Sequence, residues 1–323
     1  ELIAVPDFAF GAMENWGAVV FRENLLLYDP EKTSQAGKER ICEVIAHEIV
    51  HQWFGNLVSP LEWTYLWLNE SFATFFANRI LDHCCPDWHV WDQFLYSEIS
   101  VALVRDALWK TVPIEIPGGD THVVINAATA PIIYNKGGGI LNQMRAYIGE
   151  EAFQTGLKRY LGEHAYGCAQ SRHLWEAYGA AGDKPVARMM ESWVSQPGFP
   201  VICVRRNGTE LHLSQERFTY LPEGEEGASS RDSTWPVPLA VKTFLRGGGT
   251  MQFDILLDKK EALLDVGQDV TALKINAGQT GFYRVHYTSE EMLDSLGDRV
   301  ADKSLPVADR WGLQEDLFAM ARG

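Results

Sequence analysis

Residues 47–70 read HEIVHQWFGNLVSPLEWTYLWLNE, and this stretch decides the fold of the chain. His47 and His51 are four residues apart, so a helix places both imidazoles on one face, one turn apart. Two imidazoles in this arrangement can bind one metal ion, and Glu48 would lie beside that ion, where a base for a metal-bound water is needed. Glu70 starts a second apolar periodic segment. It is the natural third ligand, because a catalytic zinc takes three protein ligands and keeps one position open.

Coincidence is the alternative explanation for this pattern. With nine histidines in 323 residues, a His-Glu-x-x-His motif arises by chance in roughly a few per cent of such chains. A solvated helix face would also explain the motif, but its flanks are apolar, from Val44 to Ala46 and from Ile49 to Phe54 apart from His51 and Gln52. Polar groups within an apolar helix need partners, so we interpret the stretch as a site for one zinc ion.

The composition limits the class of protein. A chain of 323 residues with 46% hydrophobic and 22% charged residues predicts a globular protein of two domains, or two and a part. It has no apolar run of about 18 residues, so we expect no membrane segment. The net charge of −15 argues against a nucleic-acid partner, which requires a basic surface.

The cysteines and the first residues bear on location. Five cysteines without a CxxC pair do not form a disulfide framework, and they favour a reducing compartment, hence the cytoplasm. Residues 1–10 lack the basic and apolar regions of a signal peptide. They resemble the middle of a fold, so we expect that sequence is missing before them. The helical pattern at the C-terminal end also stops early.

Two further segments contain candidate site residues. Gly11-Ala-Met-Glu-Asn15 precedes β-like runs at residues 16–21 and 24–28, and its glycine would let a substrate backbone approach an extended edge. Glu14 would project toward that substrate, although such a glutamate is usually just solvated. Tyr134 precedes a glycine-rich entry into a helix at residues 140–148, and the plain alternative for it is a half-buried tyrosine with one hydrogen bond.

Periodicity predicts an α+β protein in three parts. Apolar spacings predict helices in the first part, which we assign to residues 1–196. The predicted helices there are two site helices within 38–80 and others near 86–111, 140–148, 151–163, 171–178 and 185–195. Alternating residues and turn signals such as Asn207-Gly208 and Gly224 to Gly227 predict a β-sandwich over residues 197–287, in which His212 and His286 are structural. Residues 288–323 turn helical again and are predicted to begin a truncated helical domain.

Together these motifs resemble one enzyme family. The quoted elements are Gly11-Ala-Met-Glu-Asn15, His47-Glu-x-x-His51, Glu70 after eighteen intervening residues, Tyr134-x-Lys136-Gly137, Trp193-x-x-Gln196-x-Gly-Phe-Pro200 and Gly281-Phe-Tyr-Arg-Val285. The set is similar to the aminopeptidase N-like zinc aminopeptidases, a gluzincin family that includes puromycin-sensitive enzymes and archaeal peptide-trimming factors. The likeness covers nearly the whole chain, and it implies a thermolysin-like, mainly helical catalytic domain.

The resemblance also implies roles for the site residues. His47, His51 and Glu70 would bind one Zn²⁺ per chain, and Glu48 would be the general base. The substrate would be a peptide with a free N-terminus, which Glu14 would hold by its amine. Tyr134 would donate a hydrogen bond to the oxyanion. The backbone of Gly11 and Ala12 would lie along the substrate, and Met13 and Asn15 belong to the same substrate-binding loop.

The chain departs from the family pattern in two respects. Members often carry Phe-Asp four to five residues before the catalytic tyrosine, where this chain has Thr129-Ala130. Members also usually begin with a β-sandwich domain and end with a large helical domain, and we expect these two missing domains to complete the site. We therefore expect the chain alone to bind zinc.

Three other functions are compatible with parts of this pattern. A thermolysin-type endopeptidase shares the zinc motif, but a carboxylate such as Glu14 that anchors a free amine penalises internal cleavage. A silent binding module would have lost Glu48, a ligand or Tyr134, and none is lost. The related epoxide-hydrolase branch fits the Glu14 motif less well, since Trp16 follows the aminopeptidase pattern.

We also expect Ala9 and Phe10 to line the first side-chain pocket.

Overall fold

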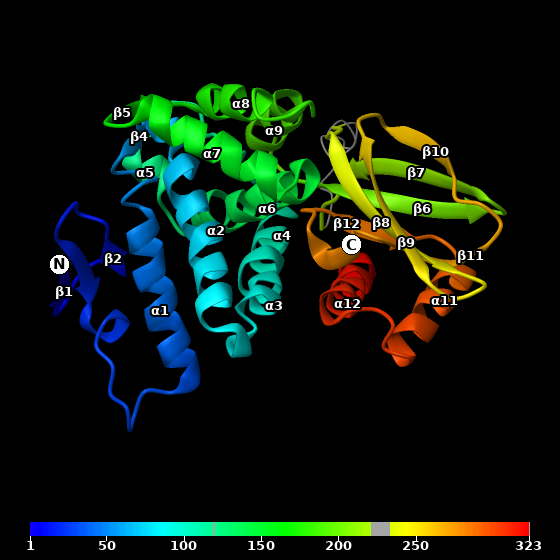
Figure 1. The fold of residues 1–323 in the computed structure, drawn as a ribbon, viewed down its shortest axis with the longest axis horizontal. Coiled ribbons are helices and arrows are strands. Elements are labelled where there is room, and N and C mark those ends of the chain that lie inside the picture. Colours follow the sequence, from blue (N-terminus) through cyan, green and yellow to red (C-terminus); the bar gives the residue numbers. More distant parts are fainter. Residues whose placement is uncertain (119, 221–232, 323) are drawn as a thin grey trace.

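Helices dominate the chain up to Ser195, and strands dominate from Pro200 to Tyr287 (Figure 1). The computed structural model describes residues 1–118, 120–220 and 233–322. The turn predicted at Gly224 to Gly227 lies outside the described residues. The predicted α+β class is confirmed, since long helices and separate sheets are both present.

The first part is a helical layer with a small sheet at one side. Its α-helices are α1 (Gln35–Val50), α2 (Trp67–Cys84), α3 (Val90–Phe94), α4 (Val101–Asp106), α5 (Thr121–Val124), α6 (Gly137–Ile148), α7 (Glu150–His164), α8 (Ser171–Gly179) and α9 (Val186–Ser195). Short 3-10 turns occur at Glu23–Leu25, Trp63–Tyr65 and Pro86–Trp88. Helices α1 and α2 lie side by side, and α6 packs on the other side of α2 (Figure 1).

A three-stranded sheet lies beside α1. Its strands are β1 (Leu2–Val5), β2 (Ala12–Met13) and β3 (Val19–Arg22), in the order β1-β3-β2. The strand predicted at residues 24–28 is wrong, because the chain forms a 3-10 turn directly after Arg22. Strands β4 (Val58–Pro60) and β5 (Gly167–Ala169) form a separate parallel pair.

The helix predicted over residues 86–111 is only partly correct. The helical run covers residues 90–106 and contains a π-helix, Leu95–Ser100, between α3 and α4. A π-turn inserts an extra residue into the helix, which matches the apolar spacing of five between Phe94 and Ile99.

Tyr134 lies within a helix and not before one. A second π-helix, Pro131–Lys136, continues directly into α6, which begins at Gly137 and not at Ile140 as predicted. Glycine is needed here because a Cβ on Gly137 would collide with the side chain of Ser71 on α2. The two π-helices contact each other, and Asn135 Nδ2 donates to Glu98 Oε2 at 2.5 Å.

Replacing Glu98 by Gln is expected to stabilise the fold above pH 7 but not near pH 4.5. Burial is the largest cause that raises the pKa of Glu98 from 4.5 to about 7. The folded chain therefore binds this proton more tightly than the unfolded chain does, and stability falls as the pH rises from 4.5 through 7. The loss is on the order of 2–3 kcal/mol. Glutamine keeps an acceptor for Asn135 and removes the buried charge.

Urea unfolding at pH 5 and pH 8 measures this effect. Glu31→Gln, on an exposed turn, is the control and should change the unfolding free energy by less than about 0.5 kcal/mol. Equal stabilisation by Glu98→Gln at both pH values would contradict the prediction.

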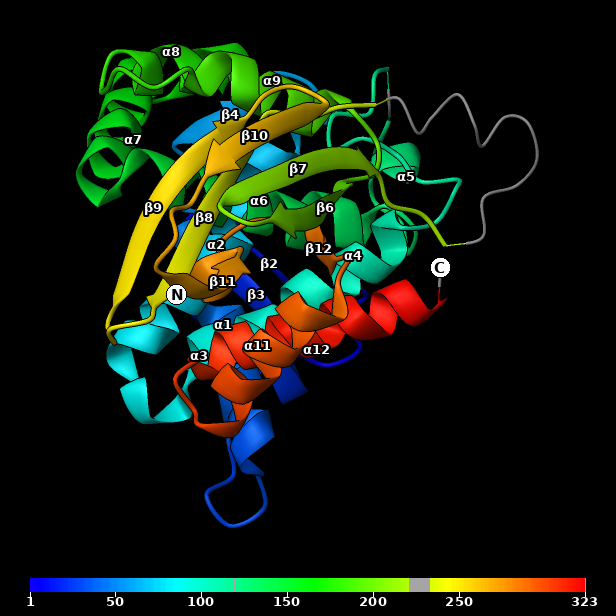
Figure 2. The same cartoon turned by 90° about the vertical axis from the view of Figure 1, so that its right-hand side faces the viewer.

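The second part contains two sheets (Figure 2). Their strands are β6 (Pro200–Asn207), β7 (Glu210–Arg217), β8 (Val237–Leu245), β9 (Thr250–Leu257), β10 (Glu261–Asp265), β11 (Val270–Ile275) and β12 (Arg284–Tyr287), with a 3-10 turn at Ala277–Gln279. The four-stranded sheet has the order β10-β7-β6-β12, with β12 parallel to β6, and the three-stranded sheet has the antiparallel order β11-β8-β9. These strands all lie within the range 197–287 for which alternation predicted strands.

Two helices follow the strands, and the parts share one core. Helices α11 (Glu290–Ala301) and α12 (Val307–Arg322) pack against β11 and β12. One continuous cluster of buried apolar side chains includes Phe72 on α2, Ile202 on β6 and Leu313 on α12. Within the described residues, no helix is both long enough and apolar enough to cross a membrane.

Candidate active site

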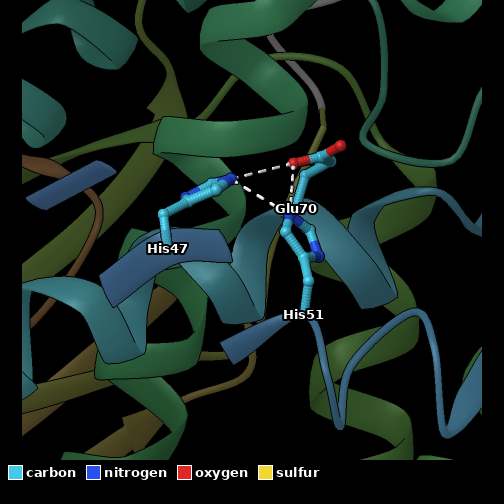
Figure 3. Close-up of side chains that lie close together, drawn as sticks. All are labelled: His47, His51 and Glu70. Atoms are coloured by element: carbon cyan, nitrogen blue, oxygen red, sulfur yellow. Dashed lines mark hydrogen bonds and ion pairs between the residues drawn. The ribbon is translucent and has the colours of Figure 1, made fainter. Parts of the chain in front are cut away.

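Helices α1 and α2 position the predicted metal ligands. Helix α1 begins after Ser34, whose Oγ accepts a hydrogen bond from Gly37 N, an arrangement that satisfies a free N–H at the helix start. The last turn of α1 carries His47 and leads to His51, while Glu70 lies in the first turn of α2. The three side chains converge between the two helices (Figure 3).

Their ligand atoms form a nearly regular triangle. The two Nε2 atoms of His47 and His51 are 3.1 Å apart, and Glu70 Oε2 lies 3.3 Å from each of them. Four tetrahedral ligands at about 2.0–2.1 Å from a zinc ion are about 3.3–3.4 Å from one another. The triangle therefore has the size of one face of a zinc coordination tetrahedron. A zinc ion held by these three groups would keep a fourth position for a water or a substrate oxygen.

His51 is held in one tautomer. Its Nδ1 lies 2.9 Å from the carbonyl oxygen of Phe54, to which it donates, so Nε2 faces the other ligands. Burial would lower the pKa of His51, but the Glu70 carboxylate outweighs burial and raises this pKa to about 9. For His47, burial outweighs Glu70 and lowers the pKa. The Glu70 carboxylate therefore favours a positive charge on His51 but not on His47.

Glu48 has the properties of a proton acceptor and donor. It lies on the inner face of α1 and is only 5% exposed, and its Oε2 has no hydrogen-bond partner among the described residues. Burial is the main cause that raises its pKa to about 8, and the carboxylates of Glu14 and Glu70 add to this. A carboxyl group with a pKa near neutrality can take up and release a proton at physiological pH.

Glu14 reaches the same site from the small sheet. Its carboxylate, that of Glu48 and a ring nitrogen of His51 lie within 4.8 Å of one another. The backbone carbonyl of Glu14 accepts hydrogen bonds from Asn56 Nδ2 at 2.7 Å and Gln52 Nε2 at 3.4 Å. Both donors follow His51 in the chain, so they fix this loop relative to the predicted ligands. Neither donor was predicted from the sequence, although Gln52 is a polar residue within an otherwise apolar flank.

The other loop residues form the edge of the small sheet. Gly11 O accepts from Arg22 N, Ala12 pairs with Phe21 and Met13 pairs with Val20. Asn15 O accepts from Ala18 N in the turn toward β3. In the described part of the chain no strand pairs with the other edge of β2, which leaves it free for an extended peptide.

The residues expected in the first side-chain pocket lie on the surface. Phe10 is 64% exposed and packs edge-on against Phe8, and Ala9 O accepts from Arg22 Nη2. Their role in a pocket stays a prediction.

Tyr134 completes the group from the second π-helix. Its ring is nearly parallel to that of His47, with centroids 6.2 Å apart and an interplanar angle of 6°. Burial, followed by the carboxylate of Glu70, raises the pKa of Tyr134 far above its usual value. The phenol therefore stays protonated and can act as a hydrogen-bond donor.

A family model described as the peptidase family M1 domain matches residues 1–193. The chain belongs to peptidase family M1. A second model, described as an ERAP1-like C-terminal domain, matches residues 272–323. The family resemblance recognised in the sequence motifs is thereby confirmed.

Curated relatives of this M1 chain are named as aminopeptidases or as a protease-interacting factor. It is 39% identical over 322 residues to the probable aminopeptidase 2 of Sulfurisphaera tokodaii, covering 98% of this chain and 38% of the relative. It is 38% identical over 323 residues to the puromycin-sensitive aminopeptidase of Caenorhabditis elegans, with coverages of 99% and 34%. It is also 39% identical over 320 residues to the tricorn protease-interacting factor F2 of Thermoplasma acidophilum, with coverages of 99% and 38%. The M1 chain thus spans less than two fifths of the length of these relatives.

Proposed function

We propose that this chain carries the catalytic site of a zinc-dependent aminopeptidase that hydrolyses the N-terminal peptide bond of peptides. The observation that carries the proposal is the position of Glu14. It lies beside Glu48 and the His47, His51 and Glu70 group. A carboxylate at that place can bind the ammonium of a free chain end by a charge-assisted hydrogen bond, which selects N-terminal residues.

His47, His51 and Glu70 would hold the zinc ion. Zinc bound there supplies a Lewis acid that polarises the scissile carbonyl and lowers the pKa of a water to about 7. Glu48 takes a proton from the attacking water and passes it to the leaving amine. Tyr134 donates a hydrogen bond to the developing oxyanion. The open edge of β2 holds the substrate backbone.

The test compares an aminoacyl-arylamide with its N-acetylated twin. We expect zinc-loaded protein to cleave the free amine only, because acetylation removes the charge that Glu14 binds. Equal cleavage of both substrates would reject the anchor and indicate an endopeptidase or a general amidase. Failure to cleave either substrate while zinc is bound, in the protein with its natural flanking chain, would reject the proposed function.

Asn56→Ala is expected to raise KM for the free-amine arylamide by about 3–10-fold, the effect of one lost hydrogen bond. The donor to the Glu14 carbonyl disappears, and the anchor shifts away from the ligands. Steady-state kinetics measure the change, and Asn24→Ala on the exposed surface serves as the control. An unchanged KM for Asn56→Ala would show that this contact does not position the anchor.

We also propose the finer organisation expected for such an enzyme. This comprises a thermolysin-like catalytic domain over residues 1–196, a β-sandwich over 197–287 and the start of a helical domain over 288–323. The end of α9 at Ser195 and the start of β6 at Pro200 support the first boundary. Domains beyond these residues would complete the site.

A cytoplasmic location is supported by five free cysteines, because reducing compartments keep thiols unpaired.

A further inference from the structure

Lys136 is a fully buried lysine two residues after Tyr134, at the end of the same π-helix. Its Nζ lies 2.8 Å from Asp106 Oδ2, and neither side chain has any exposed surface. The same Nζ donates to Gly198 O at 2.9 Å and lies 5.9 Å from the ring centre of Phe282. An ammonium has three N–H donors, and here it is surrounded by a carboxylate, a backbone carbonyl and an aromatic ring. The lysine is therefore held in one place although it is far from water.

Asp106 and Gly198 complete this arrangement. Asp106, the last residue of α4, accepts hydrogen bonds at Oδ1 from Gly198 N at 3.0 Å and from Thr111 Oγ1 at 2.8 Å. The ion pair thus holds both backbone groups of Gly198. Gly198 has a φ of +84°, and a Cβ there would lie 2.5 Å from Arg217 Nε, so only glycine fits. This glycine belongs to the segment 196–200, which leads from α9 into β6.

The turn around Tyr134 is held at each neighbouring residue. Ser71 Oγ on α2 donates to Ile133 O at 2.6 Å, and Asn135 bonds Glu98 on the other π-helix. Lys136 binds Asp106 and the 196–200 segment. Tyr134 is the residue of this turn whose ring lies against the metal ligand His47. π-turns are rare and concentrate at functional sites. This one is held by contacts with α2, with the other π-helix and with the end of α4.

We propose that the buried Lys136–Asp106 pair is a positioning device for Tyr134, which ties the hydroxyl of Tyr134 to the segment that leads into the β-sheets. The inference rests on the proposed function, in which Tyr134 is the oxyanion donor. A buried ion pair contributes little net stability compared with a well-packed apolar pair. Its directional hydrogen bonds do determine where the attached backbone lies. An oxyanion donor depends on such placement, since a shift of about 1 Å can cost about 10²-fold in rate.

The test replaces both charges at once. Lys136→Met shortens that side chain by one atom, and Asp106→Asn keeps the oxygen that accepts from Gly198 and Thr111. Neither member of the pair is then left charged without the other. In the protein with its natural flanking chain, we expect a folded, zinc-binding variant. Its kcat should be about 10–100-fold lower, with KM within about threefold of the wild type. Affinity for a phosphinic dipeptide, a mimic of the tetrahedral oxyanion, should fall in parallel.

A double-mutant cycle shows whether the pair acts through Tyr134. Tyr134→Phe alone is expected to lower kcat by about 10²–10³-fold. In the Tyr134→Phe background, the paired substitution should change kcat by less than about threefold, because no hydroxyl remains to be positioned. The matched control is Arg284→Met with Asp316→Asn, which removes another buried ion pair between β12 and α12, at 3.3 Å. It should lower thermal stability and leave kcat unchanged.

Two results would overturn the inference. One is wild-type kcat in the folded paired variant. The other is an equal loss of kcat with and without the hydroxyl of Tyr134. If the paired variant does not fold, the same kinetic comparison is made with Asp106→Asn alone. We expect it to lower kcat severalfold, and we expect this loss to disappear in the Tyr134→Phe background. Every comparison starts from a wild type that cleaves the free-amine substrate. A wild type without this activity would contradict the proposed function, whereas the two results above would contradict only the role of the ion pair.

Discussion

Glu48→Gln is expected to lower kcat by about 10²–10⁴-fold, the usual contribution of a general base. Glutamine has nearly the same shape but cannot take a proton from the attacking water. It also removes a carboxyl group whose pKa is raised to about 8, mainly by burial, so the fold should be stabilised or unchanged. Hydrolysis of an aminoacyl-arylamide measures the loss of activity, and thermal unfolding measures stability.

Zinc content must be determined beside the rate, since Glu48 is not among the proposed ligands. We expect full zinc occupancy in Glu48→Gln. The control is Glu43→Gln, five residues earlier on α1, where the side chain pairs with Arg40 near the surface. Activity within about tenfold of the wild type for Glu48→Gln would assign the proton transfer to another group.

His51→Ala is expected to abolish stable zinc binding and with it detectable peptide hydrolysis. The imidazole is 1% exposed and is fixed through Nδ1 by the carbonyl of Phe54, so the substitution removes a ligand that is held in one orientation. Changes to groups behind a ligand typically cost 10–100-fold in metal affinity, and we expect loss of the ligand itself to cost more than about 100-fold.

Thermal unfolding provides a readout independent of activity. A metal that binds only the folded chain raises its stability with concentration, so zinc should raise the Tm of the metal-stripped wild type but not that of His51→Ala. His83→Ala, on the exposed last turn of α2, should respond to zinc like the wild type. A zinc-dependent rise in Tm of equal size in His51→Ala would exclude His51 as a ligand.

The two histidines of the proposed metal site could be grouped from the sequence because their geometry is local. Two histidines four residues apart share a helix face in any chain, and Glu70 opens the next apolar helix. The strands from residue 200 onward were predictable for a similar reason, since alternation of side chains repeats every two residues. Local rules failed where the backbone departs from regular periods. The π-helix at Pro131–Lys136 places Tyr134 inside a helix, and the 3-10 turn at Glu23–Leu25 replaces a predicted strand.

The sequence by itself predicted the α+β class and the family, which are confirmed, and the His47-Glu-x-x-His51 turn that we propose binds zinc with Glu48 as base. Each of these depends on residues close together or on a motif of fixed spacing. Only the tertiary structure decided how distant segments meet. It places Glu14 beside Glu48, where Asn56 donates a hydrogen bond to the Glu14 carbonyl. It also pairs Lys136 with Asp106 and with the carbonyl of Gly198. The reason is physical. Such contacts depend on the mutual packing of α1, α2, α4 and the small sheet, and no periodicity along one segment encodes the distance between two others.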